Sequence, residues 1–228
     1  MKRSEINEII KKMEELLKQY KFSLPPFCKW TPEEWLIKNN EFDEIRNNKL
    51  GWDITDFGAG DFSKCGFALI TLRNGNQNDE NNQKVYAEKL IMLQSNQTAP
   101  LHFHWKKSED IINRGGGTLL ITLFNSNKEG EKLNSDVLVH TDGRAYYVKS
   151  GTSIKLEPGE SITLYPYQYH SFATALDTED ILIGEVSQTN DDEMDNRFFE
   201  DLPRFPKIEE DVKPYRLLCN EYPEVVNN

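Results

Sequence analysis

The sequence predicts an all-β barrel or sandwich preceded by a helical arm. From about residue 50 onward, short apolar segments alternate with turns rich in Gly, Asn and Asp, which is typical of antiparallel barrels and sandwiches. Before that point, apolar residues recur at the three- and four-residue spacing of a helix face. We therefore divide the chain into 1–49, a helical arm that packs on the barrel, and 50–228, the barrel with a C-terminal tail that wraps it, with one domain overall.

The arm is expected to contain two helices. The first covers residues 4–20, with Ser4 as its N-cap and an apolar stripe along one face. The second is expected to run from Pro32 to about Asn47, because Thr31 can cap it, Pro suits the first turn, and a glutamate occupies the third helical position. The apolar stripe of the first helix consists of Ile6, Ile9, Ile10, Met13, Leu16 and Leu17.

The barrel strands are predicted from short apolar segments that are bounded by turn residues. Asp142-Gly143 is a strong signal for a two-residue hairpin between two of them, because both positions of such a turn need a positive φ. The tail after Thr189 is acidic and contains several prolines, and we expect it to wrap the barrel. The expected strands are 67–73, 86–94, 101–105, 117–125, 137–141, 144–149, 153–156, 161–164, 170–175 and 180–186.

Composition limits the classes of partner. The chain has 228 residues and a net charge of −11, which argues against nucleic acid or an anionic membrane surface, since both bind a basic face. It contains no apolar run long enough for a spanning helix, and its N-terminus lacks the apolar core of a signal peptide. Its three cysteines are too few and too widely spaced for a disulfide framework or a paired-cysteine metal site. These features together favour a cytoplasmic location.

A histidine pair is the first candidate for chemistry. His102 and His104 are two positions apart, so on a strand both imidazoles point to the same side. An isolated pair of this kind is usually not a metal site. Here Glu109 follows after a short turn, three glycines lead into the next strand, and His170 comes from a distant segment. Three histidines and a carboxylate suit manganese, iron, zinc or cobalt, so we predict a metal site.

These four positions resemble the metal ligands of the cupin barrel, although Asn96 stands where the first cupin motif opens with Gly and the second motif is one residue shorter. Asn also tolerates the left-handed backbone conformation that such a Gly adopts. The longer motifs HFHW-x-K-x-EDIINRGGG, LxPGESITLYPYQYHSF and GEVSxTNDDxxDNRF are similar to the D-lyxose isomerase family of sugar-isomerising cupins, over most of the chain. That resemblance implies a cupin-like (jelly-roll) barrel, a homodimer and a divalent metal, usually manganese. It also implies the interconversion of D-lyxose with D-xylulose, and often of D-mannose with D-fructose.

Aldose–ketose isomerisation moves a proton between C1 and C2 through an enediolate, so it needs a Lewis acid and a base. We favour Glu185 as the base, because Ile181 and Ile183 share its side of the expected strand and suggest that it faces inward. Lys107 is the second catalytic candidate, since a nearby cation would lower its pKa and let it shuttle protons or stabilise an oxyanion. A surface carboxylate and a solvated lysine are the alternative interpretations.

Asp195 and Arg197 are the predicted substrate-binding residues, because such side chains suit sugar hydroxyls; an acidic surface loop is the alternative. The expected partner is a small monosaccharide, and the amphipathic N-terminal helix suits a homodimer. Two other functions stay open from the sequence. One is a metal-dependent cupin of different chemistry, such as a dioxygenase or an epimerase. The other is a non-catalytic sugar-binding barrel.

Overall fold

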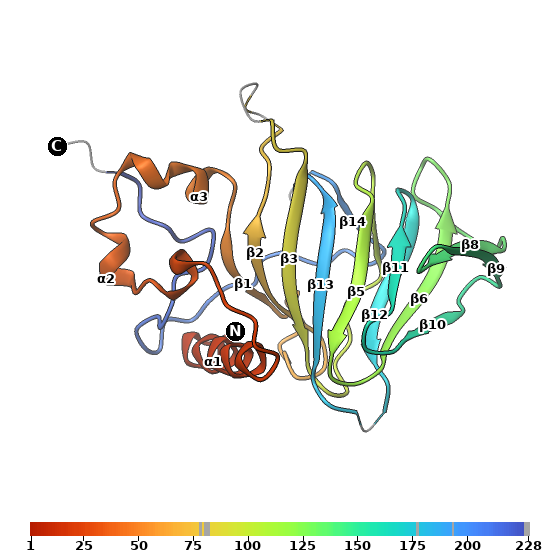
Figure 1. Cartoon of the computed structure of the whole chain (residues 1–228), viewed down its shortest axis with the longest axis horizontal. Helices are drawn as coiled ribbons and strands as arrows, with labels where there is room; N and C mark the ends of the chain where they lie inside the picture. Colours follow the sequence, from red (N-terminus) through yellow and green to blue (C-terminus); the bar gives the residue numbers. More distant parts are fainter. Residues whose placement is uncertain (78, 80–82, 177, 193, 226–228) are drawn as a thin grey trace.

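A computed structural model describes residues 1–77, 79, 83–176, 178–192 and 194–225. Two antiparallel sheets form the body, and Figure 1 shows the helices gathered beside the β1 edge of the larger one. In spatial order the eight strands of the larger sheet are β1 (Gly51–Thr55), β2 (Phe67–Arg73), β3 (Tyr86–Leu93), β13 (Ile181–Gln188), β5 (Glu109–Gly115), β11 (Ser161–Leu164), β8 (Val137–Thr141) and β9 (Arg144–Val148).

The smaller sheet carries two of the predicted histidine segments. Its central strands alternate inward apolar side chains with half-exposed ones, as a sheet with one covered face requires. In spatial order its strands are β10 (Ser153–Leu156), β6 (Leu119–Ser126), β12 (Gln168–Thr174), β4 (His102–His104) and β14 (Asn196–Phe198), with β7 (Lys132–Leu133) beside β6.

The main core lies between the two sheets. Leu119, Ile121 and Leu123 of β6 face inward and belong to the same buried cluster as Ile181 and Ile183 of β13. Burial of apolar surface from both sheets is the main term that holds them together. The sheets therefore enclose an interior into which inward-facing polar residues also project.

All ten predicted strands are present, and four of them have the predicted bounds. The segments 67–73, 137–141, 153–156 and 161–164 match their strands residue for residue. The strand β5 (Glu109–Gly115) was not predicted from the sequence, which was expected to turn between His104 and the glycines at 115–117. The strand shows an alternation of buried and more exposed side chains, but Glu109 and Asn113 occupy buried positions and Ile112 an outward one, so apolar and polar residues do not alternate in the sequence.

Two turns have the backbone conformation that the sequence predicts. Asp142 and Gly143 have φ values of 47° and 82°, so the hairpin between β8 and β9 has a positive φ at both turn positions. Asn96 has a φ of 62°, which is the left-handed conformation expected of the residue that replaces glycine.

The first helix, α1 (Arg3–Gln19), buries the predicted apolar stripe in a second core on the outer face of the larger sheet, which includes Ile54 and Ile70. The prediction that Ser4 caps this helix was wrong. Lys2 is the N-cap residue and makes no side-chain cap hydrogen bond. Instead, the Ser4 amide and hydroxyl donate to the two carboxylate oxygens of Asp211, at 2.9 and 2.6 Å. A residue of the tail thus accepts a hydrogen bond from a backbone N–H in the first turn of the helix.

The second predicted helix is broken. The capping box at Thr31 is present, but α2 (Pro32–Trp35) is only one turn long. Leu36 and Ile37, which follow it, are 73% and 80% exposed. These exposed side chains give a continued helix no tertiary packing, and a short helix without such packing is not stable. A second helical segment begins at Asn39, whose side chain accepts a hydrogen bond from the Glu41 amide. It consists of η2 (Asn40–Phe42) and α3 (Asp43–Asn47), and η1 (Pro26–Lys29) precedes α2 in the chain.

None of the helices in the described ranges is long and apolar enough to cross a bilayer. All of these helices precede β1 in the chain. The division into 1–49 and 50–228 stays a prediction.

Packing of α1 can be tested with one substitution. Ile10→Ala removes a fully buried side chain between the helix and the sheet, so we expect the free energy of unfolding to fall by about 2–5 kcal/mol. Lys11→Ala, on the exposed side of the same helix, is the matched control and should leave stability nearly unchanged. Equal urea midpoints for the two variants would contradict the packing of α1 described above.

Candidate active site

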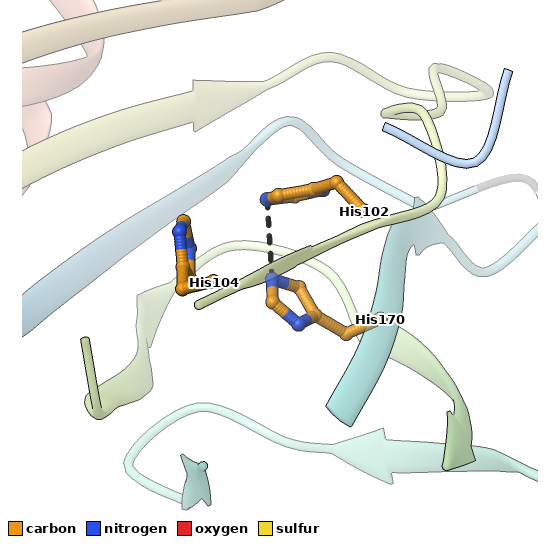
Figure 2. A group of neighbouring side chains, drawn as sticks. All are labelled: His102, His104 and His170. Carbon is orange, nitrogen blue, oxygen red and sulfur yellow. Dashed lines mark hydrogen bonds between the residues drawn. The ribbon is translucent and has the colours of Figure 1, made fainter. Parts of the chain in front are cut away.

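Three histidines meet between the sheets. His102 on β4 pairs directly with His170 on β12, and His104 lies two residues further along β4 on the same side. Figure 2 shows the three rings converging from these two strands. Each ring offers one nitrogen, and the three nitrogens lie within 4.8 Å of one another. The pairing of two distant segments therefore brings together the histidines that the sequence analysis selected.

The hydrogen bonds of the histidines decide which nitrogens carry protons. His102 Nδ1 lies 2.9 Å from the Pro100 carbonyl oxygen, and His170 Nδ1 lies 3.0 Å from the Gln168 carbonyl oxygen. A carbonyl only accepts, so both Nδ1 atoms carry a hydrogen, and in a neutral imidazole with this tautomer Nε2 is the acceptor. Burial, together with the other two imidazoles, holds the pKa of His102 well below its usual value, so this ring is neutral.

Two lone pairs consequently face each other. The Nε2 atoms of His102 and His170 are 3.1 Å apart, and the dashed line in Figure 2 joins them. In neutral rings that carry their hydrogen on Nδ1, neither Nε2 can donate to the other. His104 Nδ1 is also buried without a hydrogen-bond partner among the described residues. A divalent cation would satisfy the two facing Nε2 atoms, so the histidines fit a metal.

Glu109 supplies the carboxylate beside the histidines. As the first residue of β5 it projects from the opposite sheet, with Oε1 3.3 Å from His170 Nε2 and Oε2 3.3 Å from His104 Nε2. Burial raises the pKa of its carboxyl, but Lys107 and His104 outweigh burial and hold that pKa well below its usual value. The ionised carboxylate completes a donor set that suits manganese, iron, cobalt or zinc.

Glu185 and Lys107 lie next to this cluster. Glu185 is buried on the inner face of β13 and lines the same cavity as His102 and Glu109. Lys107 is 3% exposed, with its Nζ 2.8 Å from Glu109 Oε2 and 2.9 Å from Glu185 Oε1. The alternative interpretations, a surface carboxylate and a solvated lysine, are therefore wrong.

Three carboxylates surround the ammonium of Lys107 and act on its pKa in the opposite direction to a nearby cation. Burial lowers the pKa of its ammonium, but the carboxylates of Glu109, Glu185 and Asp192 more than offset burial and raise that pKa above its usual value. These carboxylates thus favour the charged ammonium of Lys107, which acts as a hydrogen-bond donor in this arrangement.

Asp195 and Arg197 have different positions. The buried Asp195 carboxylate accepts from the backbone N–H groups of Lys106 and Lys107, at 2.8 and 3.1 Å, and so fixes the loop that carries Lys107. Arg197 is exposed, and its side chain lies near the Tyr169 phenol. It alternates with Asn196 and Phe198, which line the cavity, so the structure does not bring Arg197 to the cluster.

The sequence analysis missed several charged residues that line this cavity. Lys89 projects inward from β3, 3.4 Å from Glu185 Oε1, and Arg204 reaches Asp192 at 3.4 Å and forms an ion pair with Asp53. Lys89 shares its side of the strand with the inward-facing Ile91, and this parity could have identified it. Arg204 and Asp192 come from irregular segments, whose sequences carry no periodic signal. The apolar wall of the cavity includes Phe57, Phe67, Phe172 and Phe198.

Comparison with known proteins gives a consistent result. The sequence model described as D-lyxose isomerase matches residues 1–222. D-Lyxose/D-mannose isomerases of Escherichia coli O157:H7 and Serratia proteamaculans are each 43% identical over 223 residues, which is 97% of this chain and 98% of each relative. The D-lyxose/D-mannose isomerase of Thermosediminibacter oceani is 28% identical over 216 residues, 92% of this chain and 99% of the relative.

Solved structures support the fold. L-ribose isomerase of Cellulomonas parahominis superposes with a TM-score of 0.60 at 12% identity, covering 92% of this chain and 98% of the other. L-ribose isomerase of Acinetobacter sp. DL28 gives a TM-score of 0.57 at 15% identity, covering 88% and 93%. The predicted cupin-like all-β fold is thereby confirmed. With the match to the family model and the 43% identity to two relatives, the chain belongs to the D-lyxose isomerase family and is an aldose–ketose isomerase.

Proposed function

We propose that this protein interconverts D-lyxose with D-xylulose and D-mannose with D-fructose, using a divalent cation held by His102, His104, Glu109 and His170. The substrates follow from the relatives that share 43% of its residues. The observation that carries the metal is the pair of Nε2 atoms of His102 and His170, 3.1 Å apart, with the Glu109 carboxylate beside them. Manganese is our first choice, and iron, cobalt and zinc suit the same donors. A homodimer and a cytoplasmic location stay predictions.

The bound cation would polarise the oxygens on C1 and C2 of the open-chain sugar. Glu185 then takes the proton from C2 of the aldose and returns it to C1, while the hydroxyl proton on O2 moves to O1. The carbonyl thus passes from C1 to C2 through an enediolate. Glu185 suits this work because it lies inside the cavity, close to the four proposed ligands but not among them.

Lys107 would stabilise the negative charge that develops on the enediolate oxygens. Its ammonium contacts both Glu109 and Glu185, so it lies between the proposed ligands and the proposed base. A buried, fixed donor is worth more than the same donor in water, since it needs no reorganisation during the reaction. The four phenylalanines of the cavity wall would keep water away from the enediolate.

Asp195 and Arg197 have unequal support as substrate-binding residues. Asp195 would act by holding the Lys107 backbone, through the two hydrogen bonds it accepts from the loop. Contact of either side chain with the sugar stays a prediction.

A substrate panel tests the proposal. Purified protein is treated with a chelator, loaded with Mn²⁺, and incubated with each aldopentose and aldohexose, and ketose formation is then followed by a colour assay. We expect D-lyxose and D-mannose to give the highest kcat/KM, and the chelated protein to give none. A panel in which no aldose yields a ketose would overturn the substrate assignment. Equal activity with and without chelator would overturn the metal.

A further inference from the structure

Two lysines converge on the proposed base. Lys89 Nζ and Lys107 Nζ lie 3.4 and 2.9 Å from the same oxygen, Glu185 Oε1. Both side chains are buried, so neither ammonium is solvated by bulk water. Two like charges this close repel each other unless other groups hold them in place.

One carboxamide holds them. The amide oxygen of Asn190 accepts from Lys89 Nζ at 2.7 Å and from Lys107 Nζ at 3.1 Å. Its side chain also lies beside the carboxylate of Asp192, whose Oδ1 is 4.0 Å from Lys89 Nζ. A carboxamide accepts at one end and donates at the other, so the neighbouring charges fix which way it points.

The backbone of Asn190 is fixed as well. Its N–H donates to Asn74 Oδ1 at 2.9 Å, and Asn74 Nδ2 donates back to the Asn190 carbonyl at 3.0 Å. Asn48 Nδ2 in turn donates to the Asn74 carbonyl at 2.9 Å. Asn48 and Asn74 are buried, so this series of asparagines anchors Asn190 to the segments that follow α3 and β2.

We propose that Asn190 is a positioning residue of the isomerase: it sets the separation of the Lys89 and Lys107 ammonium groups and thereby the access to Glu185. The proposal rests on the roles given above to Glu185 and Lys107. Asn190 acts through the two lysines rather than on the sugar.

The physical reason lies in the donors of Lys107. An ammonium has three N–H bonds, and those of Lys107 go to Glu109, Glu185 and Asn190. Removing the amide oxygen leaves one of them without its acceptor. Lys89 loses its shortest partner too, and its nearest remaining acceptor is Glu185 Oε1. The Lys89 ammonium should then shift onto the base and compete with proton transfer.

Asn190→Ala is the primary test, and Asn190→Asp is the second variant, which keeps the size and the acceptor but sets a carboxylate against Asp192. Asn125→Ala is the matched control, because Asn125 is also half-buried, bonds Ser135 and the Asp136 carbonyl, and lies on the other sheet. We expect both Asn190 variants to lower kcat by about 10–100-fold, the usual cost of losing an outer partner of a site. KM and manganese content should change much less, and the control should match the wild type.

A crystal structure of Asn190→Ala gives a readout that does not depend on activity. We expect Lys89 Nζ to lie closer to Glu185 Oε1 than 3.4 Å. Unmoved lysines, or an unchanged kcat in both Asn190 variants, would overturn the positioning role. If the wild type converts no aldose, the proposed function fails, and the lysine positions still decide whether Asn190 holds them.

Discussion

The Glu185→Gln variant is expected to lose about 10²–10⁴-fold in kcat on every aldose that the wild type converts, which is the usual contribution of a positioned base. Glutamine has nearly the same size and still accepts the hydrogen bond that Lys107 Nζ donates at 2.9 Å. It cannot take up a proton from C2. The loss should therefore appear in kcat rather than in KM, when initial rates of ketose formation are measured over a range of aldose concentrations.

A matched control separates chemistry from folding. Glu88→Gln changes a carboxylate on the outer face of the same sheet, opposite Val186 in the register and paired with Arg73. This variant should keep wild-type kcat. Manganese content of both variants is measured as well, because a carboxylate variant that fails to load metal would imitate a missing base. Full turnover by metal-loaded Glu185→Gln would show that another group is the base.

Manganese is expected to stabilise the folded protein as well as to restore its activity. A ligand that binds only the folded state raises the free energy of unfolding by about 2.7 kcal/mol at a hundred times its Kd. The proposed ligands come from β4, β5 and β12, so the cation would join the two sheets. Thermal unfolding of chelator-treated protein with added Mn²⁺ should therefore show a rise in Tm, and isomerase activity should return in parallel.

The His170→Gln variant should lose both the Mn²⁺-dependent rise in Tm and the return of isomerase activity. Glutamine fills much of the space of this buried ring but offers no imidazole nitrogen, so three of the proposed ligands remain. His140→Gln is the control, since His140 lies on β8 beside Tyr165 and away from the cluster. A Mn²⁺-dependent rise in Tm that is as large in His170→Gln as in the wild type would place the metal elsewhere.

The sequence determined the parts of this protein that depend on local periodicity. Alternation along a strand places His102 and His104 on one side of β4, and the same rule turns Glu185 inward with Ile181 and Ile183. The inward direction of these side chains follows from the two-residue period of a strand, so it could be predicted before any contacting residue was known. The hairpin at Asp142-Gly143 is equally local, because its turn residues fix the backbone.

Only the tertiary structure decided which charges meet. Asn190 bonds Lys89 across 101 positions of sequence, and Arg204 reaches Asp53 across 151. Packing likewise ended α2 early, because the residues after it find no surface to cover. Propensity and periodicity act over a few residues, whereas the partner of a buried charge depends on which distant segments the sheets bring together. The sequence therefore predicted the histidines and Glu109, and the fold decided how Lys89, Lys107 and Asn190 surround Glu185.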